Sequence, residues 1–225
     1  MTAALGIPGA GNSFEVRLSS AAIVPVLVIA DPELAVPLAE ALLEGGLRCA
    51  EITFRTAAVA ECISRVRRHF PELLVGAGTV LTVAQADAAL EAGAQFIVSP
   101  GSNPAVVEHV LGRGAPMVAG AITPSEIEDL IARDLTLIKF FPAEPAGGIP
   151  MLRALGGPYP GVRFVPTGGI SLSNLGAYLA LRSVAACGGS WMATPEQIAG
   201  AEWAGIREAS RRTVEAVRTA RPDTR

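Results

Sequence analysis

The chain has 225 residues, of which 50% are hydrophobic and 17% are charged, and its formal net charge is −3. This length suits one α/β barrel of about 200 to 250 residues, and the acidic balance argues against nucleic acid as a main partner. The longest apolar stretch, 21–30, is shorter than the roughly 20 residues that cross a bilayer, so we expect no membrane helix.

Short apolar runs recur along the chain, and helical patterns lie between them. The first run combines Pro25 with β-branched residues, which favours a strand over a signal peptide and predicts a cytoplasmic protein. This alternation of strand and helix predicts eight β/α units. The expected strands cover 23–30, 49–54, 73–78, 95–99, 116–121, 136–141, 162–167 and 184–188.

The helices are predicted from their start signals, which are Pro, Ser, Thr, Asp or Asn residues. These signals stand at Asp31-Pro32, Thr82, Asn103-Pro104, Thr123-Pro124 with Glu126, Ser173 and Thr194-Pro195. The final helix is expected over about 195–219. We divide the chain into an N-terminal segment, 1–20, with disorder expected over 1–12 and a short helix allowed over 13–20, a single barrel domain, 21–219, and a tail, 220–225.

Eight β/α units without a linker predict a (β/α)8 TIM barrel, an α/β fold, and a doubly wound open sheet is the alternative. In a barrel of this kind the active site lies at the carboxyl ends of the strands. We therefore take the strand ends in chain order.

The second strand carries charges on its inward face. Alternation with a period of two puts Glu51, Thr53 and Arg55 on one face and apolar Ile52 and Phe54 on the other. The apolar face must meet helices, so Glu51 and Arg55 are expected to point into the barrel, where a charge is costly unless it is paired or used. A structural ion pair is the alternative to a functional role.

The third and fourth strands end in small residues that leave room for a ligand. Gly76-Ala77-Gly78 leads into Thr79, whose hydroxyl could bind a carboxylate, and Ser99-Pro100-Gly101 ends the fourth strand. Glycines at these positions can also be simple turn formers.

Lys139 is the only lysine in the chain, beside 17 arginines, and it interrupts the apolar run 135–142 of the sixth strand. Lysines normally keep their ammonium group in water. An amine in apolar surroundings loses its proton more easily and can attack carbonyls, which an arginine cannot do. The sequence therefore suggests a Schiff-base enzyme with Glu51 in the same pocket. Compositional drift, with Lys139 paired to Glu144, is the alternative.

Two Gly-Gly loops follow the seventh and eighth strands. Gly168-Gly169 comes after Thr167, and Gly188-Gly189 precedes Ser190. Barrels often bind phosphate with the loops after these two strands, whose N–H groups surround the anion. The pair of loops predicts a phosphate site.

At this point the chain resembles a known family over about residues 20 to 210. The shared segments are 51–56 (EITFRT), 75–80 (VGAGTV), 99–101 (SPG), 139–144 (KFFPAE), 166–170 (PTGGI) and 188–191 (GGSW). They are similar to those of the 2-keto-3-deoxy-6-phosphogluconate (KDPG) and 4-hydroxy-2-oxoglutarate aldolases. The resemblance implies a cofactor-free, homotrimeric class I aldolase of the Entner–Doudoroff pathway, which cleaves KDPG to pyruvate and glyceraldehyde 3-phosphate.

The resemblance also implies residue roles. Lys139 would form the Schiff base, and Glu51 would be the general acid and base. The other residues fall into three sets: one would bind the carboxylate of the pyruvoyl group, one would line the pocket around it, and one would bind the phosphate at the other end of the substrate. These sets are Arg55, Thr79 and Pro100 for the carboxylate, Phe141 and Thr167 for the lining, and Gly168, Gly169 and Ser190 for the phosphate.

Other functions remain as alternatives. Two segments, 119–122 at the fifth strand and 102–103 after the fourth, are less typical of this family. They leave open the choice between KDPG, 4-hydroxy-2-oxoglutarate and another 2-oxoacid as the substrate. A phosphosugar isomerase would use the same loops without Lys139, and a non-catalytic phosphosugar-binding barrel would need neither. A metal-dependent aldolase is disfavoured, and no metal site is expected, because His69 and His109 fall in predicted helices. The three cysteines show no metal-type spacing.

Overall fold

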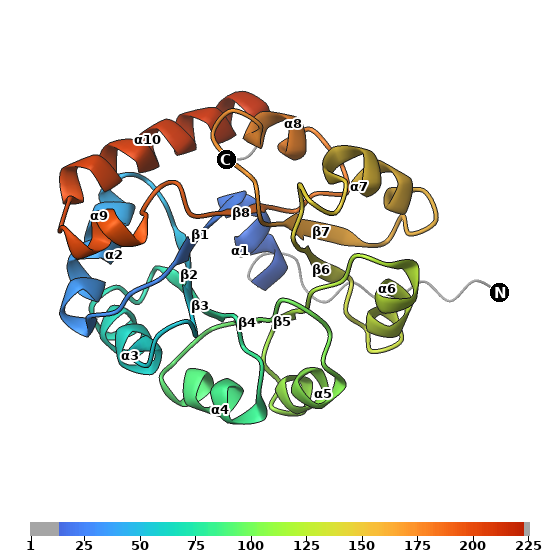
Figure 1. The fold of residues 1–225 in the computed structure, drawn as a ribbon, viewed down its shortest axis with the longest axis horizontal. Coiled ribbons are helices and arrows are strands. Elements are labelled where there is room, and N and C mark those ends of the chain that lie inside the picture. The colour runs from blue at the N-terminus through green and yellow to red at the C-terminus, as the bar shows by residue number, and fades with distance from the viewer. Residues whose placement is uncertain (1–13, 223–225) are drawn as a thin grey trace.

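The computed structural model describes residues 14–222, and these form a closed ring of parallel strands surrounded by helices (Figure 1). The strands are β1 (Ile23–Leu27), β2 (Cys49–Thr53), β3 (Leu74–Gly78), β4 (Ile97–Val98), β5 (Met117–Val118), β6 (Leu137–Phe140), β7 (Arg163–Pro166) and β8 (Cys187–Gly189). All eight predicted strands are present, although each ladder is shorter than its apolar run.

The order of strand pairing closes the barrel. Six strands pair in the order β5-β4-β3-β2-β1-β8, and β6 pairs with β7. Isolated bridges join the two groups: Gly120 pairs with Lys139 beyond the end of β5, and Phe164 and Thr167 pair with the β8 segment at Val184 and Gly188. The predicted barrel is confirmed, and the alternative of an open sheet is wrong.

The helices cover the outside of the ring, and most of them begin where the sequence predicts. They are α2 (Ala35–Glu44), α3 (Val59–His69), α4 (Val83–Glu91), α5 (Pro104–Gly112), α6 (Pro124–Ile131), α7 (Gly148–Gly156), α8 (Leu175–Leu179), α9 (Pro195–Ala199) and α10 (Trp203–Ala220), with a 3-10 turn, η1 (Pro32–Leu34), before α2. Thr123 and Glu126 form a capping box at the start of α6.

Two predicted helix boundaries are wrong. The expected single helix over 195–219 is broken between α9 and α10, because Gly200 ends α9 and Ala201 adopts a left-handed conformation with φ of 52°. Ser173 does not begin a helix, since its hydroxyl contacts that of Ser171 and α8 starts at Leu175. The tail expected from 220 begins one residue late, as α10 ends at Ala220.

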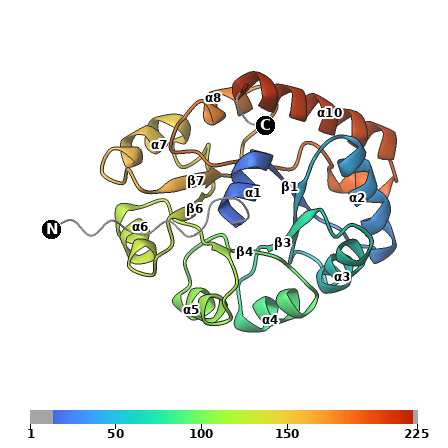
Figure 2. The ribbon, with the colours of Figure 1, turned by 180° about the vertical axis from the view of Figure 1, so that it is seen from behind.

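A short helix, α1 (Phe14–Ala21), closes the end of the barrel where the strands begin, and Figure 2 shows it lying across that opening. Leu18 is 1% exposed and joins Val24, Cys49 and Leu137 in an apolar cluster inside the barrel. The ring of Phe14 packs on Phe96 with 5.0 Å between centroids. The expected disorder of 1–12 lies outside the described residues.

We expect Leu18→Ala to lower the free energy of unfolding by about 2–5 kcal/mol, because truncating a buried leucine removes apolar contacts and leaves a cavity. Chemical denaturation measures this loss. Val16→Ala is the matched control on the same helix, since Val16 is 45% exposed. An equal loss of stability in both variants would contradict the proposed packing of Leu18 inside the barrel.

No helix within residues 14–222 combines the length and the apolar character that crossing a membrane requires.

Candidate active site

Glu51 and Lys139 meet inside the barrel near its carboxyl end. Glu51 points inward from β2 and Lys139 from β6, and they are only 3% and 5% exposed. The Nζ of Lys139 donates to Oε1 of Glu51 over 3.4 Å. The predicted shared pocket is therefore present in the structure, although 88 residues separate the two side chains along the chain.

Glu51 reaches this position because residue 78 has no side chain. A Cβ on Gly78 would lie 2.0 Å from Oε1 of Glu51, which is closer than the van der Waals radii of the two atoms allow. The glycine-rich end of β3 is thus more than a turn, since it leaves the volume that the carboxylate occupies. Gly120, the bridge partner of Lys139, must also lack a side chain, because a Cβ on Gly120 would lie 2.0 Å from the carbonyl oxygen of Pro100.

The surroundings of the ion pair are largely apolar. The ring of Phe141 lies 5.3 Å from Nζ of Lys139, and beneath the pair lie Leu137 and Val165 of the inner cluster. Desolvating two charges costs several kcal/mol per ion, which their attraction does not reliably recover. The alternative partner, Glu144, is an exposed residue that accepts a hydrogen bond from Tyr178 instead. Lys139 is therefore a buried amine paired with Glu51.

A cleft of about 260 Å³ opens at the carboxyl ends of β1, β7 and β8. It brings together six of the predicted site residues, from positions more than 130 residues apart in the chain. These are Arg55, Phe141, Thr167, Gly168, Gly169 and Ser190. The prediction that they share one face of the barrel agrees with this placement.

The loop after β7 lines this cleft with residues 167–170. Gly168 and Gly169 have φ values of 98° and 82°, which residues with a Cβ rarely adopt. The carbonyl of Gly168 accepts from the amide of Glu144, and that of Gly169 accepts from the side chain of Asn174. Within residues 14–222, no hydrogen bond is found for the amides of Gly169 and Ile170, whereas Gly168 takes part in the bridge between Thr167 and Gly188. Such a loop suits an anion.

Three predicted residues lie elsewhere than expected. Arg55 does not point into the barrel: β2 ends at Thr53, so the alternation stops there and Arg55 is exposed at the edge of the cleft. Thr79 and Pro100 do not line the cleft, and neither do Glu51 and Lys139, which lie buried inside the barrel. Thr79 follows Gly78, which touches Glu51, and Pro100 contacts Gly120, the bridge partner of Lys139.

The cleft also contains residues that the sequence did not single out, including Val26 and Val28 at the end of β1 and Pro195 at the start of α9. The signal for the two valines was present, because positions 24, 26 and 28 alternate inward along one strand. Their apolar side chains gave no indication of a ligand, whereas Gly188 and Gly189 did. A Cβ on Gly188 would lie 2.3 Å from Oγ1 of Thr167.

The remaining titratable groups are structural in character. Cys49, Cys62 and Cys187 are free and buried. Burial raises the pKa of Cys187 to about 12 and, together with the nearby charge of Glu51, raises that of Cys49, so both thiols stay protonated and poorly nucleophilic. His69 and His109 lie in α3 and α5 as predicted. Within residues 14–222 no group of three His, Cys, Asp or Glu residues could hold a metal ion.

Comparison with known proteins points to a single family. The sequence profile of the aldolase family described as KDPG and KHG aldolase matches residues 14–209. A 2-dehydro-3-deoxy-phosphogluconate aldolase of Treponema pallidum is 50% identical over 195 residues, which are 87% of this chain and 93% of that protein. A KHG/KDPG aldolase of Escherichia coli is 41% identical over 204 residues, 91% and 96% of the two chains.

A solved structure of a relative adds a chemical observation. The KDPG aldolase of Legionella pneumophila superposes with a TM-score of 0.85 at 38% identity, covering 88% of this chain and 97% of that chain. That structure captured pyruvate at low pH as a covalent carbinolamine intermediate.

Proposed function

The chain belongs to the KDPG and KHG aldolase family, and on that premise we propose that Lys139 and Glu51 carry out class I aldol cleavage in the cleft above them. The observation that carries this proposal is the 3.4 Å contact between a buried amine and a buried carboxylate. The two groups can exchange a proton, so the pair can supply the neutral amine that attacks a carbonyl. The chain is accordingly an aldehyde-lyase.

The substrate that we propose is KDPG, a 2-oxoacid with a phosphate at its far end. Neutral Lys139 attacks the ketone carbon to form a carbinolamine, which loses water to give a protonated imine. Glu51 then takes the proton of the C4 hydroxyl, directly or through a water, and the C3–C4 bond breaks. The bond electrons move into the imine and form an enamine, while glyceraldehyde 3-phosphate leaves.

The cycle ends with return of the proton. Protonation of the enamine carbon regenerates the imine, and addition of water releases pyruvate and the free amine of Lys139. Positioned proton transfer of this kind supplies roughly 10²- to 10⁴-fold in rate. Glu51 is the only carboxylate within residues 14–222 for which an ion pair with Lys139 is found, so we assign both transfers to it.

We also propose how the substrate lies in the site. Its carboxylate would be held by Arg55, Thr79 and Pro100, its carbon chain by Phe141 and Thr167, and its phosphate by Gly168, Gly169 and Ser190. The free amides and left-handed glycines of the loop after β7 support the phosphate end.

Three further properties follow from the family resemblance. We propose that the enzyme needs no cofactor, assembles as a homotrimer and works in the cytoplasm, in the Entner–Doudoroff pathway. Sedimentation velocity of the full chain tests the trimer.

Borohydride trapping tests the imine. Pyruvate with borohydride should add one reduced pyruvyl group to the intact protein, because the imine is reduced to a stable secondary amine. Peptide mapping should find it on Lys139, which is the only lysine. An unchanged intact mass under saturating pyruvate would exclude the imine mechanism and leave the phosphosugar-binding barrel as the better description.

The phosphate assignment predicts a selective effect of Ser190→Asp. The new carboxylate would repel a second anion, so kcat/KM for KDPG should fall more than kcat/KM for an unphosphorylated 2-oxoacid. Ser125→Asp, which adds the same charge at an exposed position of α6, is the control. Equal losses on both substrates would contradict the assignment.

The preferred substrate requires a direct comparison. The Escherichia coli relative is named for both KHG and KDPG, so 4-hydroxy-2-oxoglutarate is the second candidate. The ratio of kcat/KM for the two compounds, measured side by side, decides between them.

A further inference from the structure

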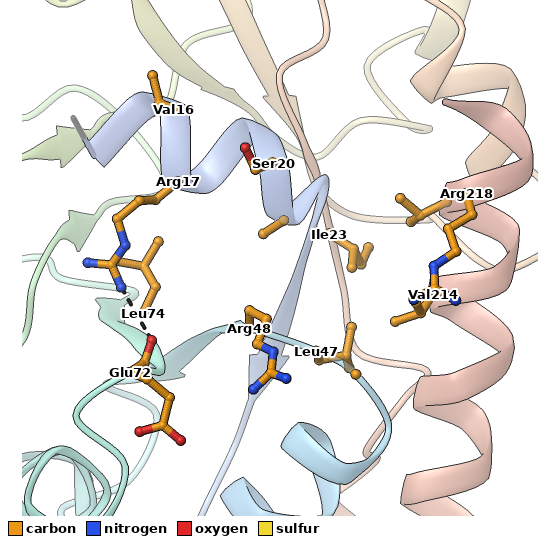
Figure 3. A pocket seen from close by; sticks show the side chains of 13 residues that line it. Val16, Arg17, Ser20, Ile23, Leu47, Arg48, Glu72, Leu74, Val214 and Arg218 are labelled. Atoms are coloured by element: carbon orange, nitrogen blue, oxygen red, sulfur yellow. Dashed lines mark hydrogen bonds between the residues drawn. The ribbon is translucent and has the colours of Figure 1, made fainter. Parts of the chain in front are cut away.

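A second cavity lies at the opposite end of the barrel, where the strands begin. It has a volume of about 490 Å³, is lined by α1, the segment leading into β2, the start of β3 and the last turns of α10, and is open to solvent, so that Arg48, Arg218 and Glu72 are exposed. Arg17 on α1, Arg48 just before β2 and Arg218 on α10 all line it, and Figure 3 shows these three side chains. This cavity shares no lining residue with the candidate active site.

The three guanidinium groups are not neutralised by the described protein. Arg17 donates to the backbone carbonyl of Glu72 over 3.4 Å, which leaves its charge unpaired. Arg48 and Arg218 make no hydrogen bond or ion pair with a side chain within residues 14–222. Other arginines of this molecule behave differently: Arg65 and Arg133 each form ion pairs with two carboxylates. Three unpaired arginines around one cavity therefore form a positively charged site.

One acidic side chain, Glu72, also lines the cavity. Three positive charges and one negative charge thus line the cavity, and the net charge of +2 suits a ligand that carries two negative charges.

The remaining wall of the cavity is apolar. Val16, Ala21 and Val214 give it partly exposed apolar surface, whereas Leu47 and Leu74 are almost completely buried. A small inorganic anion would leave this wall in contact with water. A ligand with an apolar body would cover it, and the volume falls within the range of about 300 to 1,000 Å³ that is typical of sites for small organic molecules.

We propose that this cavity binds an organic phosphate, namely a dianionic phosphate monoester with an apolar or aromatic group. Guanidinium groups match phosphate oxygens in pairs of parallel hydrogen bonds, and a phosphate monoester carries a charge close to −2 at neutral pH. The apolar group lies on Ala21 and Val214. The bound ligand joins α1 to α10 and stabilises the folded chain by mass action. This site is independent of the proposed aldol chemistry.

The test uses calorimetric titration of the full chain with phenyl phosphate. Benzenesulfonate has the same ring with one negative charge, and inorganic phosphate has the charge without the ring. Phenyl phosphate should bind most tightly of the three and raise the unfolding temperature. All titrations are repeated in the Ser190→Asp background, where binding at the opposite end of the barrel is suppressed, and the affinity of the arginine site should be unchanged.

Variants locate the binding. Arg48→Gln and Arg218→Gln should each weaken phenyl phosphate binding by roughly tenfold or more, because each removes a charge-assisted hydrogen bond. Arg212→Gln, on the exposed face of α10, is the matched control and should bind as the parent does. A crystal grown with 4-bromophenyl phosphate should show the anomalous signal of bromine beside Val214.

Several results would overturn the proposal. They are equal affinity for phenyl phosphate and benzenesulfonate, equal losses in the Arg48→Gln and Arg212→Gln variants, binding that disappears in the Ser190→Asp background, or a bromine signal in crystals without binding in solution. None of these outcomes bears on whether Lys139 forms an imine, so the two proposals fail separately.

Discussion

Lys139→Arg is expected to abolish aldol cleavage, and the same variant should give no reduced adduct with pyruvate and borohydride. The physical reason is that a guanidinium group keeps its proton at any pH at which the protein is folded and therefore has no free electron pair for a carbonyl. The positive charge is retained, so loss of activity cannot be ascribed to an unpaired Glu51. Coupled-enzyme assays of pyruvate release from KDPG measure the effect.

The result with Lys139→Arg can be interpreted only if the variant is folded. Arginine is larger than lysine, and residue 139 is 5% exposed, so crowding could unfold the barrel. Lys139→Met keeps the length of the side chain, at the cost of leaving the Glu51 carboxylate without a partner, and it should be equally inactive. Circular dichroism identifies which variants are folded. Appreciable aldol cleavage by any folded variant without Lys139 would refute the imine mechanism.

Glu51→Gln is expected to lower kcat by about 10²- to 10⁴-fold, which is the usual contribution of a positioned proton-transfer group. The amide has the shape of the carboxylate, so it fits the space above Gly78 where a larger group would not. Imine formation does not require the carboxylate in principle, and borohydride should still trap pyruvate on Lys139, more slowly. Separate measurement of trapping and cleavage distinguishes the two steps.

The comparison for this variant is Glu208→Gln, which removes an exposed carboxylate from α10 and should leave both steps unchanged. If Glu51→Gln cleaved KDPG at the parent rate, the ion pair with Lys139 would be structural, which was the alternative that the sequence left open. If it lost trapping as completely as Lys139→Arg, Glu51 would be required to free the amine and not only to move protons during cleavage.

Much of the fold could be predicted because its determinants are local. A buried parallel strand must be apolar on both faces, so the eight runs identified eight strands. Thr123 and Glu126 identified the start of α6 through their own hydrogen bonds. The predictions failed where a helix or strand ends although its sequence pattern continues. This happens at Ala201, between α9 and α10, and at Arg55, beyond the end of β2.

The sequence by itself determined the chemistry that this protein has available: one lysine in an apolar strand, an inward carboxylate on another strand and two glycine loops at strand ends. These are properties of residue type and period, which are readable along the chain. Only the tertiary structure decided that Lys139 pairs with Glu51 and not with Glu144, and that Arg17, Arg48 and Arg218 line one cavity at the far end. Those facts depend on distances across a closed barrel, which no spacing along the chain specifies.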